Sequence, residues 1–130
     1  AHPYFVPVEH TAMARDTMGA AGLLMPEIAV VLDTDPTTAR ASAREHMAMY
    51  LALPNYVNNL KRLGFSDSDV ADGGSDQLVD ALVGWGDVDA IAKRVNEHRA
   101  AGADHVCMQV VGVPQGEIPR DAWRSLGAIT

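Results

Sequence analysis

The chain has 130 residues and one cysteine, with 17 acidic against 10 basic residues and a formal net charge of −7 at pH 7. This length fits a single domain, residues 1–130, with room for a hydrophobic core. The acidic balance and the 5% aromatic content disfavour a nucleic-acid surface, which needs clustered basic side chains or stacking rings. No apolar run approaches the roughly 20 residues of a membrane span, and no signal peptide is recognisable. The sequence therefore predicts a cytoplasmic protein without nucleic-acid or membrane partners.

The first elements alternate between helix and strand. Residues 1–7 hold two prolines and predict an extended segment that resembles a loop. Residues 8–18 favour a short helix that ends at Gly19. The run over 27–32 is rich in β-branched residues and predicts a buried strand.

A longer helix follows that strand. Asp35 is well placed to cap its N-terminus, and Pro36 fits the first helical position, where a missing N–H costs nothing. The helical spacing of apolar residues continues to about Leu53, and Pro54 ends the helix.

Residues 55–86 read as an inserted helical region. Helical pieces are expected at 56–63 and 75–83, separated by an acidic turn that contains Gly73 and Gly74. The acidic residues of that turn lack the spacing and the terminal Glu of a calcium loop. We expect a solvated turn there and no metal site.

The last third of the chain predicts a helix, a strand and a helix. Asp87 should cap a helix over 88–101. The inner face of that helix is expected to carry Ile91, Val95 and His98. A final helix over 119–126 offers Trp123 and Leu126 as its packing residues.

The strand within residues 102–112 has two unlike faces. His105, Cys107 and Gln109 alternate with the apolar residues Val106, Met108 and Val110. An apolar face towards helices and a part-polar face inward suit a barrel strand whose lumen holds a ligand. A strand with satisfied core polar groups explains the pattern equally well. Cys107 is expected to be a buried, inert thiol.

The order of elements predicts an α/β fold with two parallel strands joined by helical crossovers. Two parallel strands alone expose both edges and cannot bury both faces. A complete eightfold barrel takes roughly 250 residues. We therefore expect the C-terminal portion of a TIM (β/α)8 barrel, with inserted helices over about 55–86.

Four stretches carry a family resemblance that covers nearly the whole chain. They are His2-Pro3-Tyr4, residues 26–36, residues 53–65 (LPNYVNNLKRLGF), which are the most specific, and residues 101–106 (AGADHV). In these stretches the chain resembles the luciferase-like family of oxidoreductases, above all the members that use the deazaflavin coenzyme F420. The resemblance implies hydride transfer between a small-molecule substrate and F420, or monooxygenase chemistry with FMN, at the C-terminal mouth of a barrel. The family's histidine and glutamate near the cofactor ring come from early strands without a counterpart here, so we assign no catalytic residue and expect this chain alone to be inactive.

Three residues are candidates for binding the cofactor. His2 and Tyr4 would lie on a βα loop at the active-site face of the barrel, where such loops collect ligands. Gln109 would stand nearest the C-terminal end of its strand and so nearest the cofactor ring. The alternative for His2 and Tyr4 is an exposed N-terminus with no binding role.

Three further residues are candidates for binding substrate. The family resemblance places the helix after Pro54 over the barrel mouth, with Asn55, Tyr56 and Asn59 towards the substrate. Asn58 and Asn59 are poor helix formers, so something other than helicity selects them. For Asn55 the alternative role is that of a helix cap.

The exposed strand edges predict a homo-oligomer in which strands from different copies complete a sheet. The alternative to an enzyme fragment is a non-catalytic binding or assembly module derived from a truncated barrel. A start codon directly before Ala1 would favour the module, and coding sequence continuing upstream in frame would favour the enzyme.

Overall fold

The structure is a computed structural model that describes residues 1–114 and 116–129. It is an α/β arrangement around a parallel sheet of three strands, β1 (Glu27–Val31), β2 (Val83–Trp85) and β3 (Cys107–Val110). The strand order is β2-β1-β3, so the first strand lies in the middle. The predicted α/β class and the parallel pairing are confirmed.

The helices fall close to where the sequence places them. The predicted helix over 8–18 is confirmed, and the chain also forms a helix of four residues inside the acidic turn. The helices are α1 (Val8–Met18), the short 3-10 helix η1 (Gly19–Ala21), α2 (Pro36–Leu51), α3 (Pro54–Arg62), α4 (Asp67–Val70), α5 (Asp76–Leu82), α6 (Val88–Ala100) and α7 (Arg120–Leu126).

Two predicted helix caps are confirmed. The Asp35 carboxylate accepts hydrogen bonds from the backbone N–H groups of Thr37 and Thr38, both at 2.9 Å, and Pro36 opens α2. The Asp87 carboxylate accepts from the N–H of Ala90 at 2.9 Å and caps α6. These side chains satisfy donors that have no partner inside the first helical turn.

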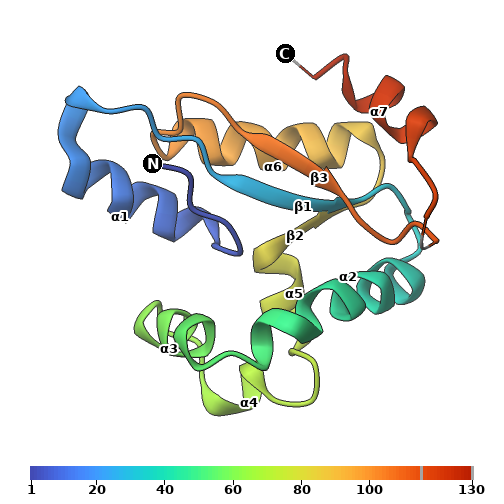
Figure 1. Ribbon diagram of the computed structural model, residues 1–130, viewed down its shortest axis with the longest axis horizontal. Coiled ribbons are helices and arrows are strands. Elements are labelled where there is room, and N and C mark those ends of the chain that lie inside the picture. Colours follow the sequence, from blue (N-terminus) through green and yellow to red (C-terminus); the bar gives the residue numbers. More distant parts are fainter. Residues whose placement is uncertain (115, 130) are drawn as a thin grey trace.

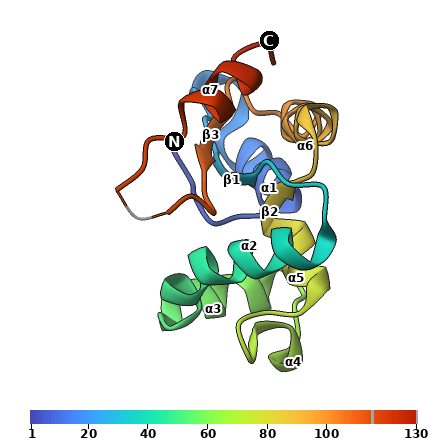
Figure 2. The same cartoon turned by 90° about the vertical axis from the view of Figure 1, so that its right-hand side faces the viewer.

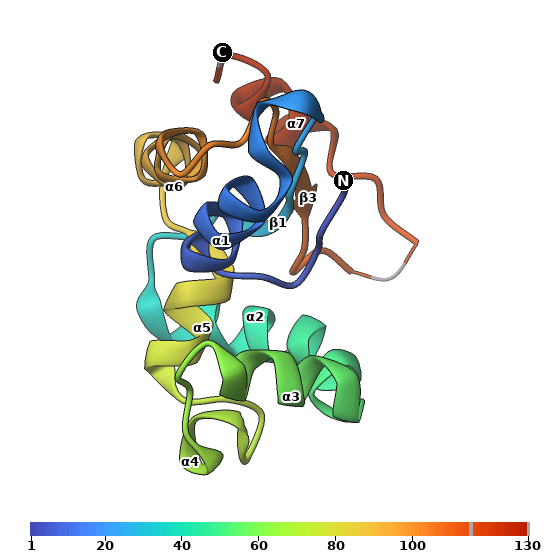
Figure 3. The ribbon, with the colours of Figure 1, turned by 90° about the vertical axis from the view of Figure 1, so that its left-hand side faces the viewer.

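The two faces of the sheet are covered by different helices. Figure 1 shows α2 to α5 gathered below the sheet and α6 and α7 above it, and Figures 2 and 3 show the same separation from the sides. On one face, Ala29, Val31 and Val83 join a core with α2, α3 and α5. On the other, Ile28 and Val30 pack with apolar residues of α6, β3 and α7. The predicted inner face of α6 (Ile91, Val95 and His98) is buried, which confirms that prediction.

The N-terminal segment runs along the same edge of β1 as β2. The N–H of Glu27 donates to the carbonyl of Pro3 at 2.9 Å, and the carbonyl of Val31 accepts from the N–H of Gly86 at 3.2 Å. Pro26, one residue away, instead accepts from the N–H of Cys107. Because alternate residues of a strand direct their N–H and C=O groups to opposite edges, residues 1–3 and β2 share one edge of β1, and β3 occupies the other.

The strand predictions need three corrections. The sheet has three strands instead of two, because Val83, Gly84 and Trp85 leave α5 and pair with β1. The predicted strand within 102–112 begins only at Cys107, and His105 is exposed ahead of it. Cys107 itself is half-buried instead of buried.

One helix prediction is half wrong. Leu126 of α7 is buried as expected, but the Trp123 ring is 54% exposed and packs little. Both residues lie on α7, a helix of seven residues, and no other helix or strand of the described residues covers the indole. Among the described residues, no helix is long and apolar enough to cross a membrane.

Candidate functional site

The N-terminal segment and α3 enclose an open groove of about 340 Å³, here called the polar groove. It brings together five of the six residues that the sequence singled out: His2, Tyr4, Asn55, Tyr56 and Asn59. Its other lining residues are Pro3, Val6, His10 and Arg62. Two of the three predicted cofactor residues and all three predicted substrate residues therefore share one surface.

The first wall of the groove is the extended N-terminal segment. Four of its residues line the groove: His2, Pro3, Tyr4 and Val6. The Nδ1 N–H of His2 donates to the carbonyl of Met25 at 2.6 Å. This bond leaves Nε2 as the ring atom that remains for a ligand.

A strained turn fixes this wall in place. Phe5 has a φ of 56°, in the left-handed region that costs a non-glycine residue about 1–2 kcal/mol. Its ring stacks on Tyr50 of α2, with centroids 4.4 Å apart and planes inclined by 17°. The stacked ring holds the segment against α2 and turns Tyr4 towards α3.

The second wall is a polar stripe along α3. Asn55, Asn59 and Arg62 follow one another at spacings of four and three residues, which places them on one helix face. Leu60 is fully buried in the core with α2 and α5. Asn55 is not the cap of this helix: the N-cap is Leu53, with Pro54 first in the helix, so the amide of Asn55 stays available to the groove.

The two walls meet in a pair of tyrosines. The Tyr56 hydroxyl donates to the Tyr4 hydroxyl at 2.6 Å, and the ring centroids lie 5.9 Å apart. This hydrogen bond, with burial, raises the pKa of Tyr56 to about 12. The Tyr56 phenol is therefore neutral at physiological pH and serves the groove as a hydrogen-bonding group with no charge.

Two lining residues escaped the sequence reasoning. His10 lies in the first turn of α1, and its Nδ1 atom is buried without a hydrogen-bond partner among the described residues. Burial lowers the pKa of His10, so its imidazole is neutral near pH 7. Arg62 had a signal in the sequence, because it continues the helical stripe of Asn55 and Asn59. His10 had none, because only the tertiary fold brings the first turn of α1 to the groove that α3 lines.

Gln109 is not part of this groove. It lies on β3, opposite Ala29 of β1, and its side chain is exposed. Cys107 and Gln109 share a face of the sheet with Glu27. The structure thus separates the predicted strand residue from the five residues that line the groove.

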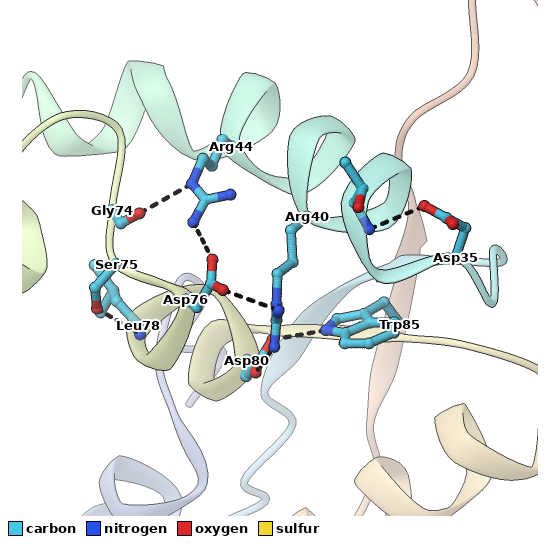
Figure 4. Close-up of polar contacts among 10 residues, drawn as sticks. Asp35, Arg40, Arg44, Gly74, Ser75, Asp76, Leu78, Asp80 and Trp85 are labelled. Carbon is cyan, nitrogen blue, oxygen red and sulfur yellow. Dashed lines mark hydrogen bonds and ion pairs between the residues drawn. The ribbon is translucent and has the colours of Figure 1, made fainter.

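A second polar cluster, here called the Arg40 clasp, joins α2 to α5 and β2 (Figure 4). Arg40 donates to both oxygens of Asp80, at 3.0 and 2.6 Å, and to Asp76 at 2.9 Å. Arg44 donates to Asp76 at 2.5 Å, and the Trp85 indole N–H donates to Asp80 at 2.8 Å. The hydrogen bonds that Asp80 accepts from Arg40 hold the pKa of the Asp80 carboxyl below its usual range.

The polar groups of the clasp bond mainly to one another. Its arginines and carboxylates pair with one another, so few donors or acceptors remain for a ligand, and its evident effect is to hold β2 and α5 against α2. Across the described part of the chain, no group of three or more His, Cys, Asp or Glu residues is arranged to hold a metal ion.

Comparison of the chain with known protein families, curated proteins and solved structures finds no match. The candidate site therefore stands on its geometry. A groove of about 340 Å³ is at the lower end of the range for ligand sites, which is roughly 300–1,000 Å³. It can hold a small planar molecule or one part of a cofactor, but a deazaflavin or FMN, with three fused rings and a phosphorylated side chain, needs further walls.

Proposed function

We propose that this chain is the C-terminal part of a luciferase-like barrel whose complete form transfers a hydride with coenzyme F420, with FMN as the alternative cofactor. By this proposal, the polar groove is one wall of a larger active site, and the chain alone is inactive. The sequence resemblance over nearly all of the chain is the starting point.

The arrangement of the N-terminal segment, β1 and β3 is the observation that carries the proposal. These three pieces follow one another along the sheet in chain order, as consecutive strands of a barrel do. The helices that connect them lie together: α1 packs beside α6 through a 2.9 Å hydrogen bond between Thr11 and His98, and α7 packs on the same core as α6. Helices along one face of sequential parallel strands are typical of a closed barrel.

The excursion from α2 to α5 fits the same proposal. These helices follow the C-terminal end of β1, and the chain then returns to the sheet through β2. The strand β2 pairs with the same edge of β1 as residues 1–3. Among these helices, α3 lies across the groove from the N-terminal segment. In barrel enzymes the segments that follow the strands build the active site. This agrees with a groove formed by residues 2–10 and α3.

The proposal is tested by fluorescence titration with F420 and with FMN. Two proteins are compared: this 130-residue chain and the full product of the reading frame that encodes it. We expect saturable binding in the micromolar range by the full product and none by the chain alone, since the chain offers only one wall. Micromolar binding by the chain alone would contradict its predicted inactivity, and no binding of either cofactor by the full product would contradict the family proposal.

A second candidate function is that of an oligomerising module, and the free edge of β3 favours it. The N–H groups of Cys107 and Val111 point to β1, so the intervening Met108 and Val110 direct their backbone groups to the opposite edge. No strand of the described residues pairs with that edge. It also lacks the lysine or proline that commonly protects an exposed edge.

Light scattering during size-exclusion chromatography tests this candidate. We expect masses above the 13.9 kDa of one chain, rising with concentration. A charge at the exposed position of the edge, as in Gln109→Lys, should shift the protein to the monomer. The matched control is Gln77→Lys, an exposed position on α5, which should change nothing. A wild-type monomer at every concentration would exclude the module.

A further inference from the structure

The polar groove differs in charge from the rest of the chain. The protein carries 17 acidic against 10 basic residues, yet no carboxylate of the described residues lines this groove. Its charged or chargeable lining consists of one arginine and two histidines. An acidic protein that keeps carboxylates out of one concave surface presents there a local environment that suits an anion.

Arg62 is the cation of the groove, and within the described part of the chain its guanidinium forms no ion pair and no side-chain hydrogen bond. Its neighbour Lys61 is paired with Asp67, and Arg40 and Arg44 are engaged in the clasp. A guanidinium presents its donors in a planar fork that matches carboxylate and phosphate oxygens. Arg62 is thus placed to bind an oxyanion in the groove.

Neutral donors lie along the same wall. The amides of Asn55 and Asn59 lie on the stripe that ends at Arg62. Neither α1 nor α3 has a side-chain cap at its N-terminus, and both begin at this groove. Helix N-termini carry partial positive charge. The one acidic residue in these first turns, Glu9, is exposed and does not line the groove.

The N-terminal wall of the groove, together with Tyr56 where the two walls meet, is aromatic and apolar. Tyr4, 43% exposed, and Tyr56 offer ring surface, and Pro3 and Val6 add apolar contact. The Tyr4–Tyr56 hydrogen bond fixes the two rings relative to each other. Rings held in this way favour a flat partner that can stack or pack edge-to-face.

We propose that the polar groove binds a small planar molecule that carries an oxyanion, either a phosphate or a carboxylate, with Arg62 as the anchor of the anion. Asn55 and Asn59 donate to the same group or to a polar atom beside it, and Tyr4 and Tyr56 contact the planar part. This assignment depends on the groove alone and holds whether or not the deazaflavin proposal is correct.

Calorimetric titration of the 130-residue chain tests the proposal with four probes: phenyl phosphate, benzoate, neutral benzamide and inorganic phosphate. We expect phenyl phosphate or benzoate to bind at least about tenfold more tightly than benzamide, and added salt to weaken that binding. Which of the two binds more tightly assigns the oxyanion. Inorganic phosphate should bind more weakly than phenyl phosphate because it lacks the ring.

Arg62→Gln should weaken binding of the preferred anion by about tenfold or more, while Arg62→Lys should retain part of it. The matched control is Lys61→Gln, one residue away and paired outside the groove, which should bind as the wild type does. Far-ultraviolet circular dichroism of each variant verifies that the fold is retained.

Three results would overturn the proposal: benzamide binding as tightly as both anions, Arg62→Gln binding like the wild type, or no binding of either anion at millimolar concentration. Inorganic phosphate binding as tightly as phenyl phosphate would overturn the planar part of it. None of these results bears on F420 or FMN binding by the full gene product, so failure here and failure of the proposed function are distinguishable.

Discussion

The Arg40 clasp and the polar groove are both rich in polar side chains, but they differ in how those side chains are used. In the clasp, Arg40, Arg44, Asp76, Asp80 and Trp85 bond to one another at 2.5–3.0 Å. In the groove, the guanidinium of Arg62 and the Nδ1 atom of His10 have no partner within the described part of the chain.

The difference separates a structural role from a binding role. Polar groups that satisfy one another stabilise the arrangement that pairs them, and removing one member leaves the other unsatisfied. Arg62 lines a concave surface without a partner, so it contributes little to stability and remains free for a ligand. The buried Nδ1 atom of His10 is instead an unsatisfied group that costs stability. The buried pair of Thr11 and His98, 2.9 Å apart between α1 and α6, belongs with the clasp in this respect.

The largest expected effect concerns His98, which is fully buried and neutral. Burial lowers its pKa to about 4 from the usual 6.5. His98 therefore binds a proton at a higher pH in the unfolded chain than in the folded chain. Its contribution to the free energy of unfolding is fully present above pH 6.5 and is lost as the pH falls to about 4. Each pKa unit is about 1.4 kcal/mol, so up to about 3 kcal/mol is lost.

Urea unfolding across this pH range measures that loss, and His98→Gln should flatten the curve between pH 6.5 and 4. Replacing the exposed His105 by Gln is the matched control and should leave the pH profile unchanged. Equal slopes for wild type and His98→Gln would show that His98 is not held neutral in the folded chain.

The next largest loss of stability is expected when the Arg40 clasp is broken. Asp80→Ala leaves two Arg40 nitrogens and the Trp85 indole N–H without their acceptor, which should cost about 2 kcal/mol of unfolding free energy. Trp85 fluorescence reports the local change. Asp67→Ala, which removes only an exposed partner of Lys61, should cost about 0.5 kcal/mol or less. Similar losses for both variants would mean that the clasp does not hold α5 to α2.

The tyrosine pair should have a smaller effect on stability and a clear effect on ionisation. Tyr4→Phe removes the hydroxyl that accepts from Tyr56, which should cost about 1 kcal/mol and return the Tyr56 pKa from about 12 towards 10. Ultraviolet absorbance during alkaline titration follows the tyrosinates. Tyr50→Phe is the control that leaves the Tyr4–Tyr56 hydrogen bond in place. If the tyrosine with the highest pKa ionises at the same pH in the wild type and in Tyr4→Phe, the Tyr4–Tyr56 hydrogen bond is excluded.

The smallest effect is expected at Arg62. Because it has no partner within the described part of the chain, Arg62→Gln should change the unfolding free energy by no more than about 0.5 kcal/mol. Arg40→Gln, which breaks the bonds to Asp80 and Asp76, should cost clearly more in the same urea titration. Equal losses would place Arg62 among the structural arginines and remove the distinction between clasp and groove.

Local chemistry made the helices predictable from the sequence. The Asp35–Pro36 pair predicts the start of α2, and Asp87 predicts the start of α6, because helix capping depends only on neighbouring residues. The sequence does not predict β2, because Val83 and Gly84 directly follow α5, and three residues are too few to show the alternating pattern of a strand. Its formation depends on pairing with β1, which the sequence does not encode locally.

The site was predictable to a similar extent. The family resemblance, together with asparagines that are unusual in a helix, singles out Asn55, Tyr56 and Asn59, and the spacing of the helical stripe adds Arg62. The position of His10 depends on how α1 packs, and the unpaired state of its Nδ1 atom is a tertiary property. Gln109 was chosen for its place on a strand, but the groove forms at the N-terminal segment and α3 instead.

The most direct test of the central claim is a map of amide shifts in a ¹H–¹⁵N spectrum of the chain titrated with phenyl phosphate and with benzoate. The account predicts that one of these anions shifts the amides of His10, Asn55, Asn59 and Arg62, while those of Arg40, Arg44 and Asp80 stay in place. Shifts centred on the clasp, or no saturable shift at the groove with either anion, would contradict it.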